Sequence, residues 1–141
     1  MSIQAVLLPL FVQVMLTFVL MCWMGYLRTS AITGGTVKTS DIALREPSWP
    51  ARATQVANAF HNQLELPVLF YVLTILAWIT RHADYLFVLM AWIFVVLRLA
   101  HAFIHTTGND VRRRGGVFIA AAIVLALMWL IFMLRILLGL G

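Results

Sequence analysis

The chain has 141 residues, of which 63% are hydrophobic and only 11% are charged. A soluble domain carries about 25% charged residues, so this composition excludes an ordinary soluble protein. The formal net charge of +5 does not indicate a nucleic-acid-binding protein, because the basic residues flank hydrophobic runs, as they do in membrane proteins. We therefore expect an integral membrane protein that lies in the lipid bilayer. We do not expect it to bind nucleic acid.

The hydrophobic residues form four long stretches, at residues 5–27, 53–80, 85–107 and 117–138. A membrane-spanning helix needs about 20 predominantly apolar residues, so each stretch is a predicted span. The spans and their connectors use almost the whole chain, which leaves residues 1–141 as a single domain. Because most connectors are short, successive spans are antiparallel neighbours. The predicted fold class is an all-α integral membrane protein, a four-transmembrane-helix up-down bundle.

The connectors and one proline complete this prediction in chain order. Arg28 closes the first span, and residues 28–50 form a polar connector rich in glycine and proline. Pro67 lies inside the second span and removes the hydrogen bond to the carbonyl of Gln63; we expect an ordinary kink in a continuous helix. Residues 81–84 form a short turn, and a second connector, residues 108–116, carries three consecutive arginines.

The distribution of basic residues predicts the orientation in the membrane. Nine of the ten Lys and Arg residues lie near the ends of spans. Seven lie at one end of the bundle: Arg28, Lys38, Arg45, Arg52, Arg112, Arg113 and Arg114. Only Arg81 and Arg135 lie at the other. The positive-inside rule then places the two basic connectors in the cytoplasm and both termini outside, in a membrane that we expect to be the bacterial inner membrane.

Two polar stripes interrupt the second and third spans. Residues three or four apart share one face of a helix, and this spacing joins Asn58, Asn62 and Glu65 in the second span and Arg98, His101, His105 and Asn109 in the third. Ionisable groups at membrane depth are costly, and they are kept mainly where they pair or function. Glu65 lies ~20 Å and Arg98 ~15 Å from the same membrane face, so we expect them to form a buried ion pair, in one chain or across a subunit boundary.

These residues leave several interpretations open. A Glu65–Arg98 pair alone would be a structural device as readily as a functional one. His101 and His105 are four residues apart, but without a second carboxylate they make a weak zinc pattern, and we expect no metal. The three arginines of the second connector first of all fix topology and contact lipid headgroups.

The second and third spans also carry motifs of a known family. The run His61-Asn62-Gln63-Leu64-Glu65-Leu66-Pro67, with Arg52-Ala53 before it and Phe70 after it, resembles the second-helix motif of the MAPEG family, the membrane-associated proteins in eicosanoid and glutathione metabolism. Arg98-Leu99-Ala100-His101 resembles the Arg-x-x-His motif of the family's third helix. The resemblance covers nearly the whole chain and is strongest to the bacterial branch of the family.

The resemblance implies a homotrimer of four-helix subunits that binds glutathione, as co-substrate, between neighbouring subunits near their cytoplasmic half. It implies that Asn62 and Glu65 hold the glutathione backbone, while Arg98 and His101 match the family's third-helix pair. Arg114 best matches an arginine placed near the glutathione thiol, although Arg112 or Arg113 remains an alternative. Lys38 or Arg28 stands where the family has a basic residue after the first helix.

Two positions differ from the family pattern. His105 stands where the prostaglandin E and leukotriene synthases have a tyrosine, and Asn58 stands where many members have an arginine. We keep Asn58 among the binding residues, and His105 beside Arg114 as a catalytic residue that donates a proton or hydrogen bond. The implied function is a glutathione transferase or peroxidase acting on lipophilic small-molecule substrates. The alternatives are a non-catalytic membrane scaffold and a small transporter with a His/Glu/Arg relay.

Overall fold

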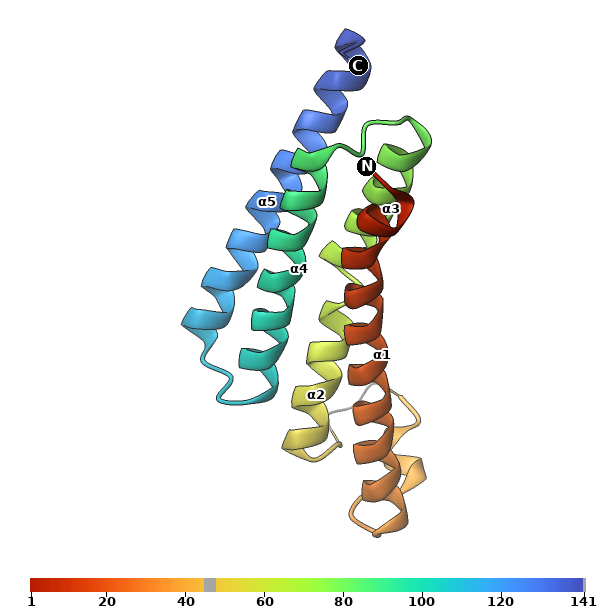
Figure 1. The fold of residues 1–141 in the computed structure, drawn as a ribbon. Helices are drawn as coiled ribbons and strands as arrows, with labels where there is room; N and C mark the ends of the chain where they lie inside the picture. The colour runs from red at the N-terminus through yellow and green to blue at the C-terminus, as the bar shows by residue number, and fades with distance from the viewer. Residues whose placement is uncertain (45–47, 141) are drawn as a thin grey trace.

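The structure, a computed structural model, describes residues 1–44 and 48–140. The helices are α1 (Ile3–Thr33), the short 3-10 helix η1 (Thr39–Ile42), α2 (Ala51–Asn62), α3 (Leu66–Ile79), α4 (Tyr85–Thr106) and α5 (Val111–Leu138). Four segments are long and apolar enough to cross a membrane, with α2 and α3 together forming the second. This confirms the predicted four-helix membrane bundle. Both termini lie at one end, and the connectors after α1 and α4 lie at the other (Figure 1).

Local capping explains where the helices begin and end. A side chain accepts a hydrogen bond from a first-turn amide in three helices: Ser2 in α1, Asp84 in α4 and Asp110 in α5. Such caps satisfy amides that have no partner inside the helix. At the other end of α5, Gly139 takes a left-handed conformation with φ of 61°, which costs glycine little.

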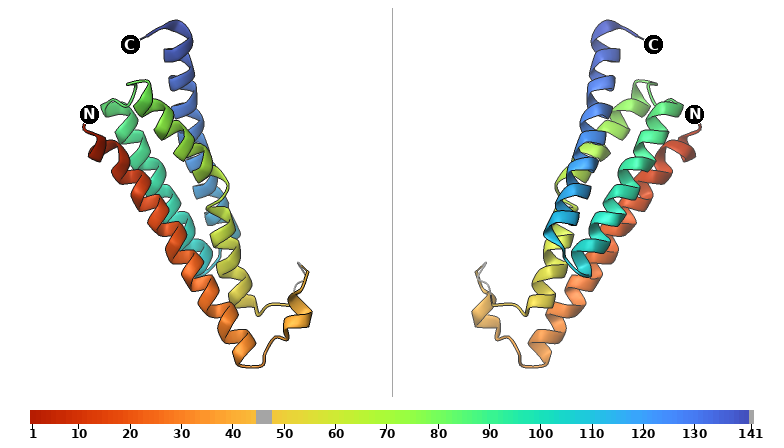
Figure 2. Two further views of the ribbon diagram at one scale, coloured as in Figure 1. Left: turned by 90° about the vertical axis from the view of Figure 1, so that its right-hand side faces the viewer. Right: turned by 90° about the vertical axis from the view of Figure 1, so that its left-hand side faces the viewer.

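Two helices are longer than the hydrophobic stretches that predicted them. Helix α1 continues past Arg28 to Thr33, because no glycine or proline occurs between Arg28 and Gly34. The guanidinium of Arg28 lies 4.9 Å from the ring centroid of Trp49, two residues before the start of α2. Helix α5 begins at Val111, so the three arginines belong to its first turn. The segment between α1 and α2 projects at the lower end of the bundle (Figure 2), and Arg45 lies outside the described residues.

The second span is broken rather than kinked, which corrects the expectation of a continuous helix. Helix α2 ends at Asn62, and α3 begins at Leu66 with Pro67 in its first turn. Proline is tolerated there because the first amides of a helix have no intrahelical acceptor. Residues 63–65 form the turn between the two helices, where the chain changes direction in Figure 2. This break determines the geometry of the polar centre described below.

The interior contains two hydrophobic clusters with a polar layer between them. The larger cluster includes Val6, Phe70 and Phe94. The smaller one consists of Leu20, Ala59 and Ala102 with their neighbours. On each of the three spans involved, a fully buried polar residue lies between the members of the two clusters: Gln13 on the first, Gln63 on the second and Arg98 on the third.

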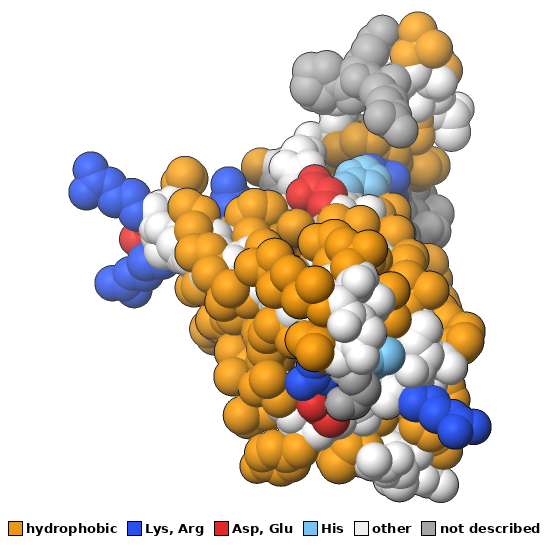
Figure 3. Space-filling model, turned by 90° about the horizontal axis from the view of Figure 1, so that it is seen from above, with side chains coloured by type: hydrophobic (Ala, Val, Ile, Leu, Met, Phe, Trp, Pro, Cys, Tyr) orange, Lys and Arg blue, Asp and Glu red, His pale blue; other side chains and the backbone are white. Residues whose placement is uncertain are grey.

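The outer surface is largely apolar, as a lipid-facing surface must be. Exposed leucine, isoleucine, valine, phenylalanine and methionine side chains occur on α1, α3, α4 and α5. Seen from the end that holds the termini, hydrophobic side chains cover most of the visible surface, and basic side chains project at its edges (Figure 3). Such extended apolar faces are unsuited to water and are natural in a bilayer.

Candidate functional site

A polar groove near the connector end of the bundle brings together four of the residues predicted from the sequence. It has a volume of about 340 Å³ and is lined by Asn62, Glu65, His101, Arg114, Gly115, Phe118 and Ile119. The lining residues come from the break in the second span, from α4 and from the start of α5. The groove is therefore built by three segments that are far apart in the sequence.

Arg98 is the anchor of this region. Its side chain is fully buried, and Nη2 donates hydrogen bonds to the backbone oxygen of Asn62, at 3.1 Å, and to its side-chain oxygen. The carbonyl of Asn62 lies at the end of α2, where helical carbonyls lose their intrahelical partners. Arg98 thus caps α2 and also orients the Asn62 amide. With its oxygen directed to Arg98, the Asn62 Nδ2 group is turned toward the Glu65 carboxylate, 3.4 Å away.

Two glutamines that the sequence analysis missed support Arg98. Gln13 Nε2 donates to Gln63 Oε1 at 2.9 Å, and Arg98 Nη2 approaches the same oxygen at 3.4 Å. Gln63 Nε2 donates to the Ala59 carbonyl at 3.0 Å. The signal for Gln13 was present in the sequence, since a lone glutamine deep in an apolar span requires a polar partner. Gln63 lies within the family-like motif, between Asn62 and Glu65, and only those two neighbours were given a role.

The expected buried ion pair between Glu65 and Arg98 is not formed within the chain. Among the described residues, the ion pairs within 4.0 Å are Arg113–Asp110 and Arg135–Asp84. Arg98 is buried, but Glu65 is exposed, because the break after Asn62 removes Glu65 from the α2 face. Asn62 links the two charges instead. The same break means that Asn58, Asn62 and Glu65 do not form one helical stripe.

The two histidines of α4 lie beside each other at the inner wall of the groove. His101 and His105 are both buried, with ring centroids 5.6 Å apart. The His101 ring also contacts Phe118, at 5.8 Å between centroids. His101 lines the groove, whereas His105 adjoins His101 without lining it. The Nδ1 atoms of both rings and the Nε and Nη1 atoms of Arg98 are buried, and no residue in the described part of the chain forms a hydrogen bond with them.

Of the three consecutive arginines, the structure places Arg114 at the groove. Arg112 and Arg113 are exposed, while Arg114 is partly buried. Arg114 Nη1 donates to the side-chain oxygen of Asn109. Asn109 was expected on the α4 stripe, but α4 ends at Thr106, and Asn109 lies in the following turn with φ of 51°. The side-chain amide of Asn109 therefore accepts a hydrogen bond from Arg114 and does not extend the polar face of α4.

The remaining predicted residues lie outside the groove of the single chain. Asn58 is exposed on α2, and Lys38 is exposed next to η1. Two other α2 residues, Arg52 and Gln55, bind the end of α4. Gln55 Nε2 donates to the carbonyl of His105 at 2.8 Å. Roles for Asn58 and Lys38 remain predictions.

Comparison with known families bears directly on this arrangement. The model of the MAPEG family matches residues 6–134, which covers both polar motifs and all four spans. The chain belongs to the MAPEG family. No curated protein and no solved structure matches it. Family membership and the four apolar helices together make this MAPEG protein an integral membrane protein.

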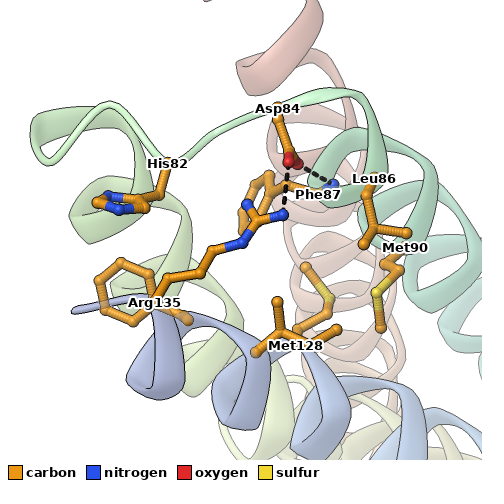
Figure 4. A pocket seen from close by; sticks show the side chains of 9 residues that line it. His82, Asp84, Leu86, Phe87, Met90, Met128 and Arg135 are labelled. Carbon is orange, nitrogen blue, oxygen red and sulfur yellow. Dashed lines mark hydrogen bonds and ion pairs between the residues drawn. The ribbon is translucent and has the colours of Figure 1, made fainter. Parts of the chain in front are cut away.

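The opposite end of this MAPEG protein holds a second polar cluster that closes a small apolar cavity (Figure 4). Arg135 Nη2 lies 2.7 Å from Asp84 Oδ2, and Asp84 Oδ1 accepts from the Phe87 amide at 2.9 Å. Partial burial alone would raise the pKa of Asp84, but the hydrogen bonds from Arg135 and Phe87 and the Arg135 charge outweigh it and lower the pKa. The cavity between Met90 and Met128 is too small for more than a water molecule or two.

Proposed function

We propose that this MAPEG protein binds glutathione in the groove and joins its sulfur to lipophilic electrophiles, or reduces a lipid hydroperoxide to an alcohol and water while two glutathione molecules are oxidised to their disulfide. The single observation that carries the proposal is the convergence of Asn62, Glu65, His101 and Arg114 on one groove. Binding sites for small molecules typically have volumes of about 300–1,000 Å³, and the groove lies within that range.

The polar groups of the groove match the chemistry of a peptide ligand. Because Arg98 occupies the Asn62 side-chain oxygen, Asn62 offers an N–H donor, and Glu65 beside it offers a carboxylate acceptor. A peptide carbonyl can accept from the first, and an amide or ammonium group can donate to the second. The basic end of the bundle attracts an anion such as glutathione, whose two carboxylates outnumber its single ammonium group.

Arg114 is the proposed activator of the thiol. A free thiol has a pKa near 8.5, and a nearby cation stabilises the thiolate, which is the reactive form. In a transfer reaction the thiol proton leaves to solvent, the sulfur forms a bond to an electrophilic carbon, and the leaving group departs with its bonding electrons. His105 remains a candidate donor to that leaving group, although it is buried beside His101 and does not line the groove of the single chain.

The apolar wall of the groove suits a second substrate that arrives from the membrane. Ile119 is 59% exposed on the outer surface and also lines the groove, next to Phe118. A lipophilic molecule partitioned into the bilayer can thus reach the polar residues without crossing water.

We further propose that the protein works as a homotrimer in the bacterial inner membrane, with its basic end in the cytoplasm. The apolar outer faces of the helices and the open side of the groove support an assembly in which a neighbour completes the site. Chemical cross-linking in detergent, read as the largest covalent species, tests the trimer; a ladder that stops at a dimer contradicts it.

Isothermal titration calorimetry with detergent-purified protein tests the proposed site. We expect glutathione to bind the natural protein, and Glu65→Gln and Arg114→Ala to weaken binding about tenfold, which corresponds to 1.4 kcal/mol. Arg113→Ala is the matched control. It also removes one arginine charge, but from an exposed side chain at the position next to Arg114. Equal weakening by Arg113→Ala and Arg114→Ala would mean that only the general field of the basic end matters. Transfer to a chromogenic lipophilic electrophile then tests catalysis.

A further inference from the structure

The turn between α4 and α5 contains a residue whose conformation and side chain both serve Arg114. Asn109 has φ of 51°, a left-handed conformation that asparagine adopts more readily than other residues with a side chain. Its backbone amide donates to the Ile104 carbonyl at 2.8 Å, which closes the end of α4. Its side-chain oxygen accepts from Arg114 Nη1. Glycine could make the same turn, but it could not make the second contact.

The turn itself is held in place by α2. Gln55 Nε2 donates to the carbonyls of His105, at 2.8 Å, and Thr107, at 3.1 Å, and Arg52 Nη1 donates to the Thr106 carbonyl. These are carbonyls of the last turn of α4, which lack intrahelical partners. The helix that carries Asn62 therefore also fixes the turn that carries Asn109. Asn109 is thus a rigid point from which the Arg114 side chain can be held relative to the groove.

We propose that Asn109 is a positioning residue, which holds the Arg114 guanidinium at the groove so that this cation stabilises an anionic sulfur bound there. The inference rests on the proposed function, in which Arg114 stabilises the thiolate of bound glutathione. An unrestrained arginine samples many rotamers, and its average field at one atom is weak. A side chain held at one nitrogen keeps its other guanidinium nitrogens available to a ligand.

The other charged groups around the groove define what the measurement must control. Glu65 and His101 line the groove with Arg114. The Arg98 guanidinium carbon lies 6.0 Å from the Phe118 ring centroid, and His105 adjoins His101. All four are unchanged in the variants below. The difference in the sulfur's titration between the natural protein and Asn109→Gly therefore reports on Arg114, whereas Asn109→Asp also brings a new negative charge close to the sulfur.

The experiment follows the thiolate of bound glutathione by its ultraviolet absorbance as a function of pH, in full-length detergent-purified protein at saturating glutathione. The variants are Asn109→Gly, which permits the turn but removes the acceptor, and Asn109→Asp, which keeps the acceptor but adds a negative charge beside Arg114. Arg113→Ala is the control for a lost surface charge. Circular dichroism and gel filtration establish that each variant is folded.

We expect the apparent pKa of the bound thiol to rise in the order natural protein, Asn109→Gly, Asn109→Asp, and to stay unchanged in Arg113→Ala. The first step should lower the ratio of thiolate to thiol at a fixed pH about tenfold, which is one pKa unit. A natural protein that forms thiolate, with no change in folded Asn109→Gly, overturns the positioning role alone. No thiolate in the natural protein overturns the proposed function and this inference together. If Asn109→Gly does not fold, an unshifted titration in Asn109→Asp overturns the inference.

Discussion

Arg98 donates hydrogen bonds to both the backbone oxygen and the side-chain oxygen of Asn62, and so joins α4 to the last residue of α2. This contact explains why an arginine can be fully buried in a membrane-spanning bundle. The break in the second span leaves carbonyls without helical partners, and the arginine supplies the donor that lipid cannot. It also sets the Asn62 amide in one orientation at the groove.

Double-mutant cycles should find the coupling of Arg98 with Asn62 and not with Glu65. We expect Arg98→Leu to lower the free energy of unfolding by about 3–5 kcal/mol, as for other broken buried charge networks. Combined with Asn62→Ala it should be clearly non-additive, by at least about 0.5 kcal/mol, whereas with Glu65→Gln it should be nearly additive. Denaturant titration in mixed micelles measures the four free energies. Strong coupling between Arg98 and Glu65 would contradict this expectation and would support the direct ion pair predicted from the sequence.

Gln13 should contribute to stability although it lies on a different helix from the groove. Gln13→Leu removes the hydrogen bond to Gln63 and should cost about 1 kcal/mol, the scale of polar contacts between membrane helices. Gln4→Leu is the matched control, because Gln4 is an exposed glutamine of the same helix. Unfolding in mixed micelles compares the two. A loss of stability from Gln4→Leu as large as that from Gln13→Leu would contradict the account.

The Asp84–Arg135 pair should make stability depend on pH in the acid range. Because the pKa of Asp84 is lowered in the folded protein, its contribution is present above the ordinary pKa of aspartate and is lost as pH falls through the folded value. Asp84→Asn keeps a capping side chain but removes the charge. Since Asp84 is partly exposed, we expect a loss of at most about 1 kcal/mol at neutral pH. Melting curves of the variant and the natural protein should converge below about pH 4.

The proposed orientation predicts which connectors an impermeant thiol reagent can reach. In a Cys22→Ser background, Ser40→Cys should be unreactive in intact cells and reactive after permeabilisation. Arg81→Cys should be reactive in both. The two positions are exposed at opposite ends of the bundle. The asymmetry of basic residues between those ends is the physical reason. Labelling of Ser40→Cys in intact cells would show that the orientation is the reverse of the one proposed.

The sequence was sufficient for the four spans, because long apolar stretches have few alternatives to membrane helices. Asn62, Glu65, His101 and Arg114 were among the eight predicted site residues, and the structure brings these four to one groove. The sequence could not predict the break after Asn62. Proline is compatible with either a kink or a new helix start, and the choice depends on whether a neighbour satisfies the freed carbonyls.

That one local choice accounts for most of the differences from the sequence-based prediction. With a continuous helix, Glu65 would face Arg98; with the break, Asn62 and Gln63 face it instead. Similarly, Asn109 fits the α4 spacing in sequence, yet the chain turns before it. Helical periodicity indicates which residues share a face only as long as the helix continues.

The thermal stability of the purified protein at increasing glutathione concentrations tests the central claim most directly. A ligand that binds the native state must stabilise it, by about 2.7 kcal/mol at a hundredfold excess over its dissociation constant. We expect the midpoint of unfolding to rise steadily up to millimolar glutathione in the natural protein and in Arg113→Ala, and much less in Arg114→Ala. A midpoint that does not move in the folded natural protein would contradict the claim and leave a non-catalytic scaffold.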